Sequence, residues 1–149
     1  MRASCETHSP EETERLGERI ASRLQPGDVV ALTGDIGAGK TCFTRGLARG
    51  LGSTTPASSP TFVLVHRHDL PRPGSALYHL DLYRLDSEDE LEDIGGRELM
   101  YGPDICVVEW AERAAGLIPD GAFTMRIELL GLTSRRFAVS GPRSILDED

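Results

Sequence analysis

The sequence predicts an α/β protein of three layers, in which helices cover both faces of a mostly parallel sheet and antiparallel hairpins extend that sheet. Two short, wholly apolar runs, residues 29–32 and 105–108, are typical of parallel strands that are buried on both faces. Two segments with apolar residues four apart, 16–24 and 43–51, predict amphipathic helices. With 149 residues, of which 39% are hydrophobic and 27% charged, we expect one globular domain over residues 1–149.

The first half of the chain alternates helix, strand and helix. Ser9 and Glu12 form a capping-box pattern, and the apolar spacing predicts that the helix after it ends near Leu24. Pro26-Gly27 separates this helix from the strand at 29–32, and a glycine-rich loop then leads into a second helix over 40–51. Residues 53–60 consist almost wholly of Ser, Thr, Pro and Ala, which predicts a mobile loop.

The second half of the chain predicts two hairpins, one short helix and one more buried strand. The helix follows a second capping box, Ser87 with Glu90, and ends at Gly95-Gly96. The apolar strand at 105–108 runs directly into Glu109. The predicted hairpins comprise residues 62–68 with 76–83 and residues 123–130 with 135–140, and residues 141–149 are expected to form a frayed acidic tail.

The glycine-rich loop carries the pattern GxxxxGK(S/T), from Gly34 to Thr41. In this pattern backbone N–H groups cradle phosphates, the lysine reaches the β- and γ-phosphates, and the hydroxyl ligates magnesium. A strand before the loop and a helix after it are the context that the motif needs, so we expect a P-loop NTPase fold that binds ATP and Mg²⁺. The predicted nucleotide contacts in the loop and first helical turn are Asp35, Gly37, Ala38, Gly39, Lys40, Thr41 and Cys42.

Lysine usage supports the importance of this loop. Of the 16 basic residues, Lys40 is the only lysine and the others are arginines. Arginine replaces lysine readily on a solvated surface, but less well where a compact ammonium on a flexible stem is needed. The remaining lysine lies within the phosphate-loop pattern, and we predict a catalytic role for it.

Magnesium also needs a carboxylate from a neighbouring strand, and two acids end apolar strand candidates. These are Asp81, in His-Leu-Asp-Leu-Tyr-Arg, and Glu109, in Val-Val-Glu-Trp. An acid at the end of a buried strand must be paired or metal-bound to offset its desolvation. Both are therefore candidates for a magnesium or water-orienting role, and the alternative is a structural ion pair, for instance with Arg84.

Four other residues merit separate predictions. Composition alone favours Trp110, the only tryptophan, as a core residue. His66 and His68 lie two apart on one strand, but no third metal ligand is evident, which favours a solvated face. Thr61 lies just after the predicted mobile loop, where its hydroxyl could reach the γ-phosphate as in a switch segment.

Charge and cysteine content exclude several classes of protein. A net charge of −8 disfavours unaided binding to RNA or DNA. Three cysteines without a C-x-x-C pair argue against a disulfide framework or a zinc knuckle. The first ten residues do not resemble a signal peptide, and no segment is apolar enough to span a membrane, so we expect a cytoplasmic protein without membrane contact.

Four motifs in this order and spacing closely resemble the TsaE (YjeE) family. They are the phosphate loop, Ser59-Pro-Thr-Phe62, His79-Leu-Asp-Leu-Tyr-Arg-Leu85 and Val108-Glu-Trp110. The resemblance implies an ATPase that acts with the TsaD and TsaB proteins in forming threonylcarbamoyladenosine in tRNA, with tRNA contacted only indirectly. It also implies roles for particular residues: Thr41 and Glu109 at magnesium with Asp81 close to it, Thr61 in a nucleotide-sensing switch, and Trp110 beside the site. The resemblance covers about residues 9–130, and Arg135 or Arg136, which lie beyond it, are our candidates for the adenine side.

Three alternative functions remain open on the sequence alone. A small-metabolite or nucleoside kinase would share the loop, the fold and the size, although the 53–60 segment lacks the arginine that a kinase lid usually carries. A GTPase would need a second lysine in its guanine-reading motif. The third alternative is a nucleotide-binding interaction protein with negligible turnover.

Overall fold

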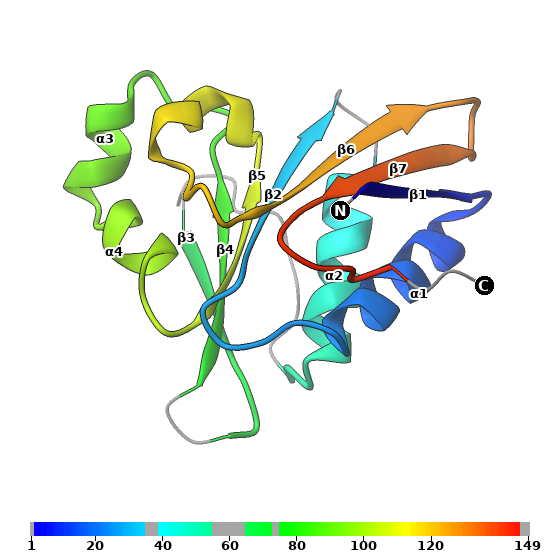
Figure 1. Cartoon of the computed structure of the whole chain (residues 1–149), viewed down its shortest axis with the longest axis horizontal. Coiled ribbons are helices and arrows are strands. Elements are labelled where there is room, and N and C mark those ends of the chain that lie inside the picture. The colour runs from blue at the N-terminus through cyan, green and yellow to red at the C-terminus, as the bar shows by residue number, and fades with distance from the viewer. Residues whose placement is uncertain (1, 35–38, 55–64, 73–74, 147–149) are drawn as a thin grey trace.

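Seven strands form one sheet in the part of the chain that the structure describes. The computed structural model describes residues 2–34, 39–54, 65–72 and 75–146. The strand order is β1-β7-β6-β2-β5-β4-β3 (Figure 1). The strands are β1 (Arg2–Thr7), β2 (Val29–Gly34), β3 (Val65–Asp69), β4 (Ala76–Asp81), β5 (Ile105–Glu109), β6 (Phe123–Leu129) and β7 (Arg135–Ser140).

The parallel part of the sheet lies at its centre, as predicted. β6, β2, β5 and β4 run parallel to one another, whereas β7 and β1 on one side and β3 on the other are antiparallel additions. Both predicted hairpins are present, as β3–β4 and β6–β7. Residues 62–64 of the first predicted strand lie outside the described residues. All five residues of β5 are buried, which matches an apolar strand covered on both faces.

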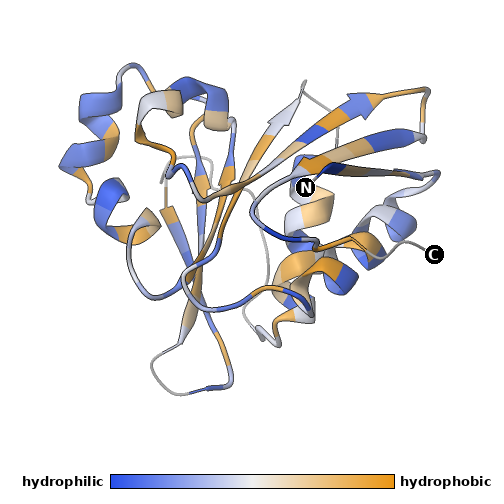
Figure 2. Ribbon diagram, in the orientation of Figure 1, coloured by the Kyte–Doolittle hydropathy of each residue, from blue (hydrophilic) through white to orange (hydrophobic). Residues whose placement is uncertain are grey.

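Helices cover the two faces of the sheet unequally. α1 (Pro10–Ala21) and α2 (Lys40–Gly50) pack on one face, over a core that extends from β4 to β7. α3 (Glu88–Asp93), α4 (Gly96–Met100) and the 3-10 helix η1 (Ala111–Leu117) pack on the other face, over β2, β4 and β5. Figures 1 and 2 show these three layers, with the apolar residues of the strands between the helices.

The contact between α1 and α2 depends on two glycines. A Cβ added to Gly46 would lie 2.0 Å from the Glu14 carbonyl oxygen, and one added to Gly17 would lie 2.4 Å from the Phe43 carbonyl oxygen. The two helix backbones therefore approach more closely than any side chain would allow. This close approach fixes the position of α2, whose first residue is Lys40.

The N-terminal ends of α1 and α3 follow the capping patterns of the sequence. Ser9 Oγ accepts a hydrogen bond from the Glu12 N–H at 3.1 Å, and Ser87 Oγ accepts one from the Glu90 N–H at 3.4 Å. The first helix ends at Ala21 rather than near Leu24, because the chain turns there toward Pro26-Gly27.

Several features differ from the sequence-based expectations, among them α4 and η1, which no sequence pattern predicted. β1 was not predicted, and it pairs with β7 from the other end of the chain. Residues 141–146 are not a frayed tail, because Ile145 and Leu146 are buried in the core beneath α1 and Arg143 forms an ion pair with Asp28 at 2.6 Å. His68 is fully buried rather than solvated, and its ring lies 4.5 Å from that of His66.

Candidate functional site

The carboxyl ends of three neighbouring strands meet beside the first turn of α2. In the strand register, Glu109 of β5 lies opposite Leu32 of β2 on one side and opposite Asp81 of β4 on the other. In open parallel sheets, ligands bind at this edge. The strand register therefore brings the two predicted acids to the edge at which the phosphate-loop pattern begins.

The described part of the phosphate loop leads directly into α2. Gly34 and Gly39, with φ of 144° and 101°, have backbone conformations that disfavour other residues. Lys40 begins α2 and is 95% buried, since its exposed fraction is 5%. Its ammonium donates a hydrogen bond to the Gly34 carbonyl oxygen at 2.5 Å, so the lysine side chain bridges the two ends of the loop.

Glu109 is a buried acid with a partner that the sequence did not reveal. Its carboxylate accepts a hydrogen bond from His79 Nε2, and both side chains are almost fully buried. Burying a carboxylate without a partner would be costly, and the imidazole offsets that cost. The partner is His79 and not Arg84, which forms no ion pair among the described residues. The bond to His79 holds the Glu109 carboxylate in place at the end of β5.

Asp81 is half-buried, and some of its neighbours raise the pKa of its carboxyl whereas others lower it. Burial raises the pKa of its carboxyl above the ordinary value, and the negative charge of Glu109 adds to the rise. Three groups act in the other direction: the Tyr83 N–H, which donates to Asp81 Oδ1 at 3.0 Å, and the more distant charges of His79 and Lys40. A nearby cation would favour the carboxylate form.

Trp110 is partly buried, packs against the core beneath α3, α4 and η1, and lies beside the loop lysine. The ammonium of Lys40 is 4.0 Å from the centroid of the indole ring, which is a cation–π contact. The other neighbour of the indole is the Tyr83 ring at 5.0 Å, and the Arg113 guanidinium lies 5.7 Å from the Tyr83 ring. Trp110 has φ of 58°, the one positive φ of a non-glycine residue in the described chain. Such backbone strain often occurs at functional sites.

Of the two arginines considered for the adenine side, Arg135 is the one near the loop. A Cβ added to Gly39 would lie 3.9 Å from Arg135 Nε. The Arg135 guanidinium also donates to the carbonyl oxygens of Gly131 at 3.1 Å and Ser134 at 3.0 Å. Arg136 forms ion pairs with Glu6 and Glu128 instead.

The remaining predicted contacts divide into two groups. Thr41 and Cys42 follow Lys40 in the first turn of α2, and both are partly buried. The other predicted contacts lie outside the described residues, and they are Asp35, Gly37, Ala38 and Thr61.

Comparison with known proteins assigns the chain to a family. Residues 7–137 match the family described as "Threonylcarbamoyl adenosine biosynthesis protein TsaE". The chain belongs to the TsaE family. A TsaE protein of Treponema pallidum is 40% identical over 136 residues, which cover 91% of this chain and 98% of the relative. One of Bacillus subtilis is 42% identical over 128 residues, which cover 84% and 77%.

A solved structure supports the fold. The crystal structure of Bacillus subtilis YdiB superposes with a TM-score of 0.74 and 30% sequence identity, and the match covers 95% of this chain and 86% of YdiB. The chain therefore has the α/β P-loop NTPase fold that the sequence predicts.

The side chains of this TsaE-family site fit a nucleotide with magnesium. Magnesium prefers oxygen ligands and usually retains waters and phosphate oxygens, so that few protein ligands suffice. Thr41, Asp81 and Glu109 offer a hydroxyl and two carboxylates. Within the described residues no cluster of three or more acidic, histidine or cysteine side chains could hold a metal ion. This donor set suits a cation that is shared with phosphates better than a cation held by protein alone.

Sequence reasoning missed His79 and Tyr83 as members of the site, although both lie in the quoted motif His79-Leu-Asp-Leu-Tyr-Arg-Leu85. His79 precedes Asp81 by two residues, so on a strand both side chains lie on the same face. That spacing was the available signal.

In the described chain, no helix has the length and apolar character that crossing a membrane requires.

Proposed function

We propose that this TsaE-family chain binds and hydrolyses Mg-ATP to support the formation of threonylcarbamoyladenosine in tRNA by TsaD and TsaB. The observation that carries the proposal is the convergence of Lys40, at the start of α2, with Asp81 and Glu109, which are adjacent in the register of β4 and β5. Positive charge for phosphates and carboxylates for a metal ion lie at one edge of the sheet.

Each side chain has a distinct role in this proposal. Lys40 contacts the β- and γ-phosphates, exchanging its present bond to the Gly34 carbonyl for phosphate oxygens. Thr41, Asp81 and Glu109 would hold the metal ion and orient the attacking water, and the metal ion would supply neutralisation of the phosphate charge. His79 keeps the Glu109 carboxylate in one orientation. Trp110 lines the site beside Lys40, and Arg135 lies toward the adenine.

The partners follow from the family and from the charge of the chain. Because the net charge is −8, the phosphate backbone of tRNA would be repelled, so tRNA is contacted through TsaD and TsaB. Thr61 senses the γ-phosphate, and binding to the partners depends on the nucleotide state.

The test measures ATP affinity by calorimetry for the wild-type chain, Lys40→Ala and the control Arg45→Ala. Arg45 is on the same helix but exposed and paired with Glu14. We expect Lys40→Ala to abolish tight ATP binding, because no second lysine replaces it, and Arg45→Ala to retain it. Unchanged ATP affinity in a folded Lys40→Ala protein would refute the assignment of the phosphate loop.

A second measurement separates the hydrolase from the alternative functions. Phosphate release is measured with and without purified TsaD and TsaB, and candidate metabolites are scanned as phosphate acceptors. Phosphate release that the partners stimulate supports the proposal. Phosphorylation of a metabolite would indicate a kinase, and the absence of turnover in every mixture would indicate a nucleotide-binding interaction protein.

A further inference from the structure

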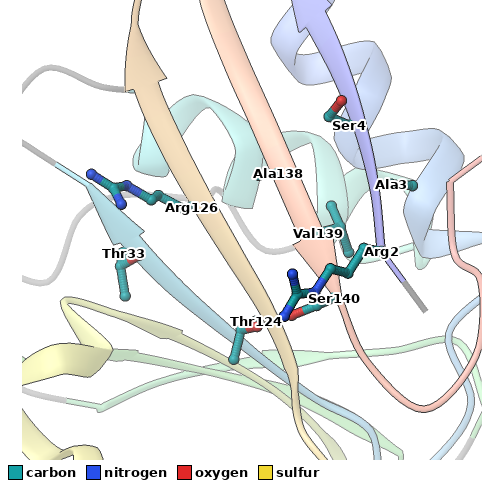
Figure 3. Close-up of a pocket in the computed structure, with 9 residues that line it drawn as sticks. All are labelled: Arg2, Ala3, Ser4, Thr33, Thr124, Arg126, Ala138, Val139 and Ser140. Carbon is teal, nitrogen blue, oxygen red and sulfur yellow. Dashed lines mark hydrogen bonds between the residues drawn. The ribbon is translucent and has the colours of Figure 1, made fainter.

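A hollow of about 730 Å³ lies on the sheet face opposite α1 and α2, where β1, β7, β6 and the end of β2 are adjacent. Its polar lining comes from all four strands. Figure 3 shows the Arg126 side chain extending from β6 toward the side of β2 and the Arg2 side chain extending toward Thr124 and Ser140. The polar lining residues are Arg2, Ser4, Thr33, Thr124, Arg126 and Ser140.

The hollow is open because the helical layer on this side of the sheet is incomplete. β6 alternates between buried residues, such as Met125 and Ile127, and exposed residues, such as Thr124 and Arg126. The buried residues face α1 and α2. The core formed with α3, α4 and η1 includes residues of β2, β4 and β5 but none of β1, β6 or β7 among the described residues.

On this open face, arginines form ion pairs with acidic residues at one end only. Arg136 lies on the same face and forms ion pairs with Glu6 at 3.2 Å and Glu128 at 3.1 Å. By contrast, Arg2 and Arg126 form no ion pair within the described chain, and no carboxylate is among the described residues that line the hollow. The described lining of the hollow therefore carries two positive charges and no negative charge, although the chain as a whole has 24 acidic and 16 basic residues.

We propose that this hollow is the docking site for an extended, acidic segment of a partner protein. A guanidinium donates two parallel hydrogen bonds to a carboxylate, and two guanidinium groups in one hollow fit two acidic side chains. The hydroxyls of Thr124 and Ser140 hydrogen-bond to each other at 2.5 Å, and with the Ser4 hydroxyl they keep acceptor capacity for the N–H groups of a peptide. A protein segment fits better than a nucleic acid, because the long-range repulsion from a chain of charge −8 grows with the length of a polyanion.

The position of the hollow connects this docking site to the nucleotide site. Thr33, which lines the hollow, precedes Gly34, and Arg126 lies opposite Thr33 in the register of β6 and β2. A segment bound to Arg126 would therefore contact the strand that leads into the phosphate loop. The inference does not depend on ATP hydrolysis, because Arg2 and Arg126 lie on the open face of the sheet and are not among the residues proposed to bind ATP.

The experiment uses the full chain and a fluorescent glutamate-rich peptide, with a glutamine-rich peptide and a single-stranded RNA oligonucleotide as comparison probes. Binding is measured by fluorescence anisotropy for the wild type, the double variant Arg2→Gln/Arg126→Gln and the control Arg136→Gln. The double variant loses both exposed guanidinium–carboxylate pairs, so it should bind the acidic peptide about tenfold more weakly, which corresponds to about 1.4 kcal/mol. Arg136→Gln should bind as the wild type does, and the backbone amide NMR signals of Thr33 and Thr124 should shift on titration.

Four results would overturn the proposal. The first is an acidic peptide that does not bind, or that binds equally to the double variant and the wild type. The second is an equal loss of binding in Arg136→Gln, which would mean diffuse attraction to the whole face. The third is equal affinity for the glutamine-rich peptide. The fourth is tighter, Arg126-dependent binding of the oligonucleotide, which would make the occupant a nucleic acid. Circular dichroism establishes that each variant is folded, and ATP binding by the double variant separates this result from any failure of the nucleotide site.

Discussion

The substitution Gly46→Ala tests whether the close contact between α1 and α2 positions the nucleotide site. The added Cβ would lie 2.0 Å from the carbonyl oxygen of Glu14, 2.7 Å from its carbonyl carbon and 2.8 Å from its Cα. All three atoms belong to the backbone of α1, so no side-chain rotation relieves the overlap. Since ordinary contacts begin near 3.4 Å, the helices must separate by roughly 1 Å.

The expected loss of stability follows from two opposing contributions. Overpacking costs about 1–3 kcal/mol, and a contact with backbone alone places this site at the upper end of that range. The better helix propensity of alanine returns about 1 kcal/mol. We therefore expect Gly46→Ala to lower the free energy of unfolding by about 2 kcal/mol and the melting temperature by roughly 4–8 °C.

Differential scanning calorimetry measures this effect against the control Gly121→Ala, because an added Cβ at Gly121 would meet nothing within 4 Å. ATP affinity, measured by titration calorimetry, should fall in Gly46→Ala and not in the control, because Lys40 and Thr41 move with α2. If Gly46→Ala melts at the same temperature as the wild type, the inferred close approach of the two helices is wrong.

Three further substitutions test the proposed site. Asp81→Asn should slow phosphate release far more than it weakens ATP binding. Burial raises the pKa of Asp81, so its ionised form opposes folding at pH values above that pKa. The variant should therefore be more stable than the wild type in urea at pH 7, and this advantage should shrink as the pH falls. Glu109→Gln should likewise lower turnover while calorimetry shows nearly unchanged ATP affinity, whereas full turnover with a lower melting temperature would make Glu109 a purely structural partner of His79. Thr61→Ala should weaken the nucleotide dependence of TsaD–TsaB binding in pull-downs and leave ADP binding intact. In filter binding, the wild-type chain alone should show no tRNA affinity at physiological salt. Tight tRNA binding would contradict the argument from the net charge of the chain.

The sequence predicts best those features that local pattern determines. The strand at 29–32, the helix after the phosphate loop and both hairpins follow from apolar spacing and turn residues within short segments, and the structure contains them. The position of Asp81 and Glu109 at one edge follows as well, because acids that end buried parallel strands converge at the carboxyl edge of the sheet.

The sequence predicts poorly those features that depend on contacts between distant segments. The sequence of β1 has no clear alternation of apolar and polar residues, and most of its residues are exposed. It forms a strand because it pairs with β7. The hydrogen bond between His79 and Glu109 depends on the register of β4 against β5, which no local pattern contains. Ile145 and Leu146 were grouped with the acidic residues that follow them, although their apolar side chains complete the core.

The pairing of β1 with β7 has a consequence for how the chain folds during synthesis. Arg2 pairs with Ser140, so β1 leaves the ribosome long before its partner strand does. Joining such distant segments carries a large loop-closure entropy, and folds rich in contacts of this kind form slowly. The helices α1 and α2, which are close in sequence and pack through their glycines, can associate long before this. The sheet is therefore completed last at the edge formed by β1, although β1 is synthesised before every other strand of the sheet.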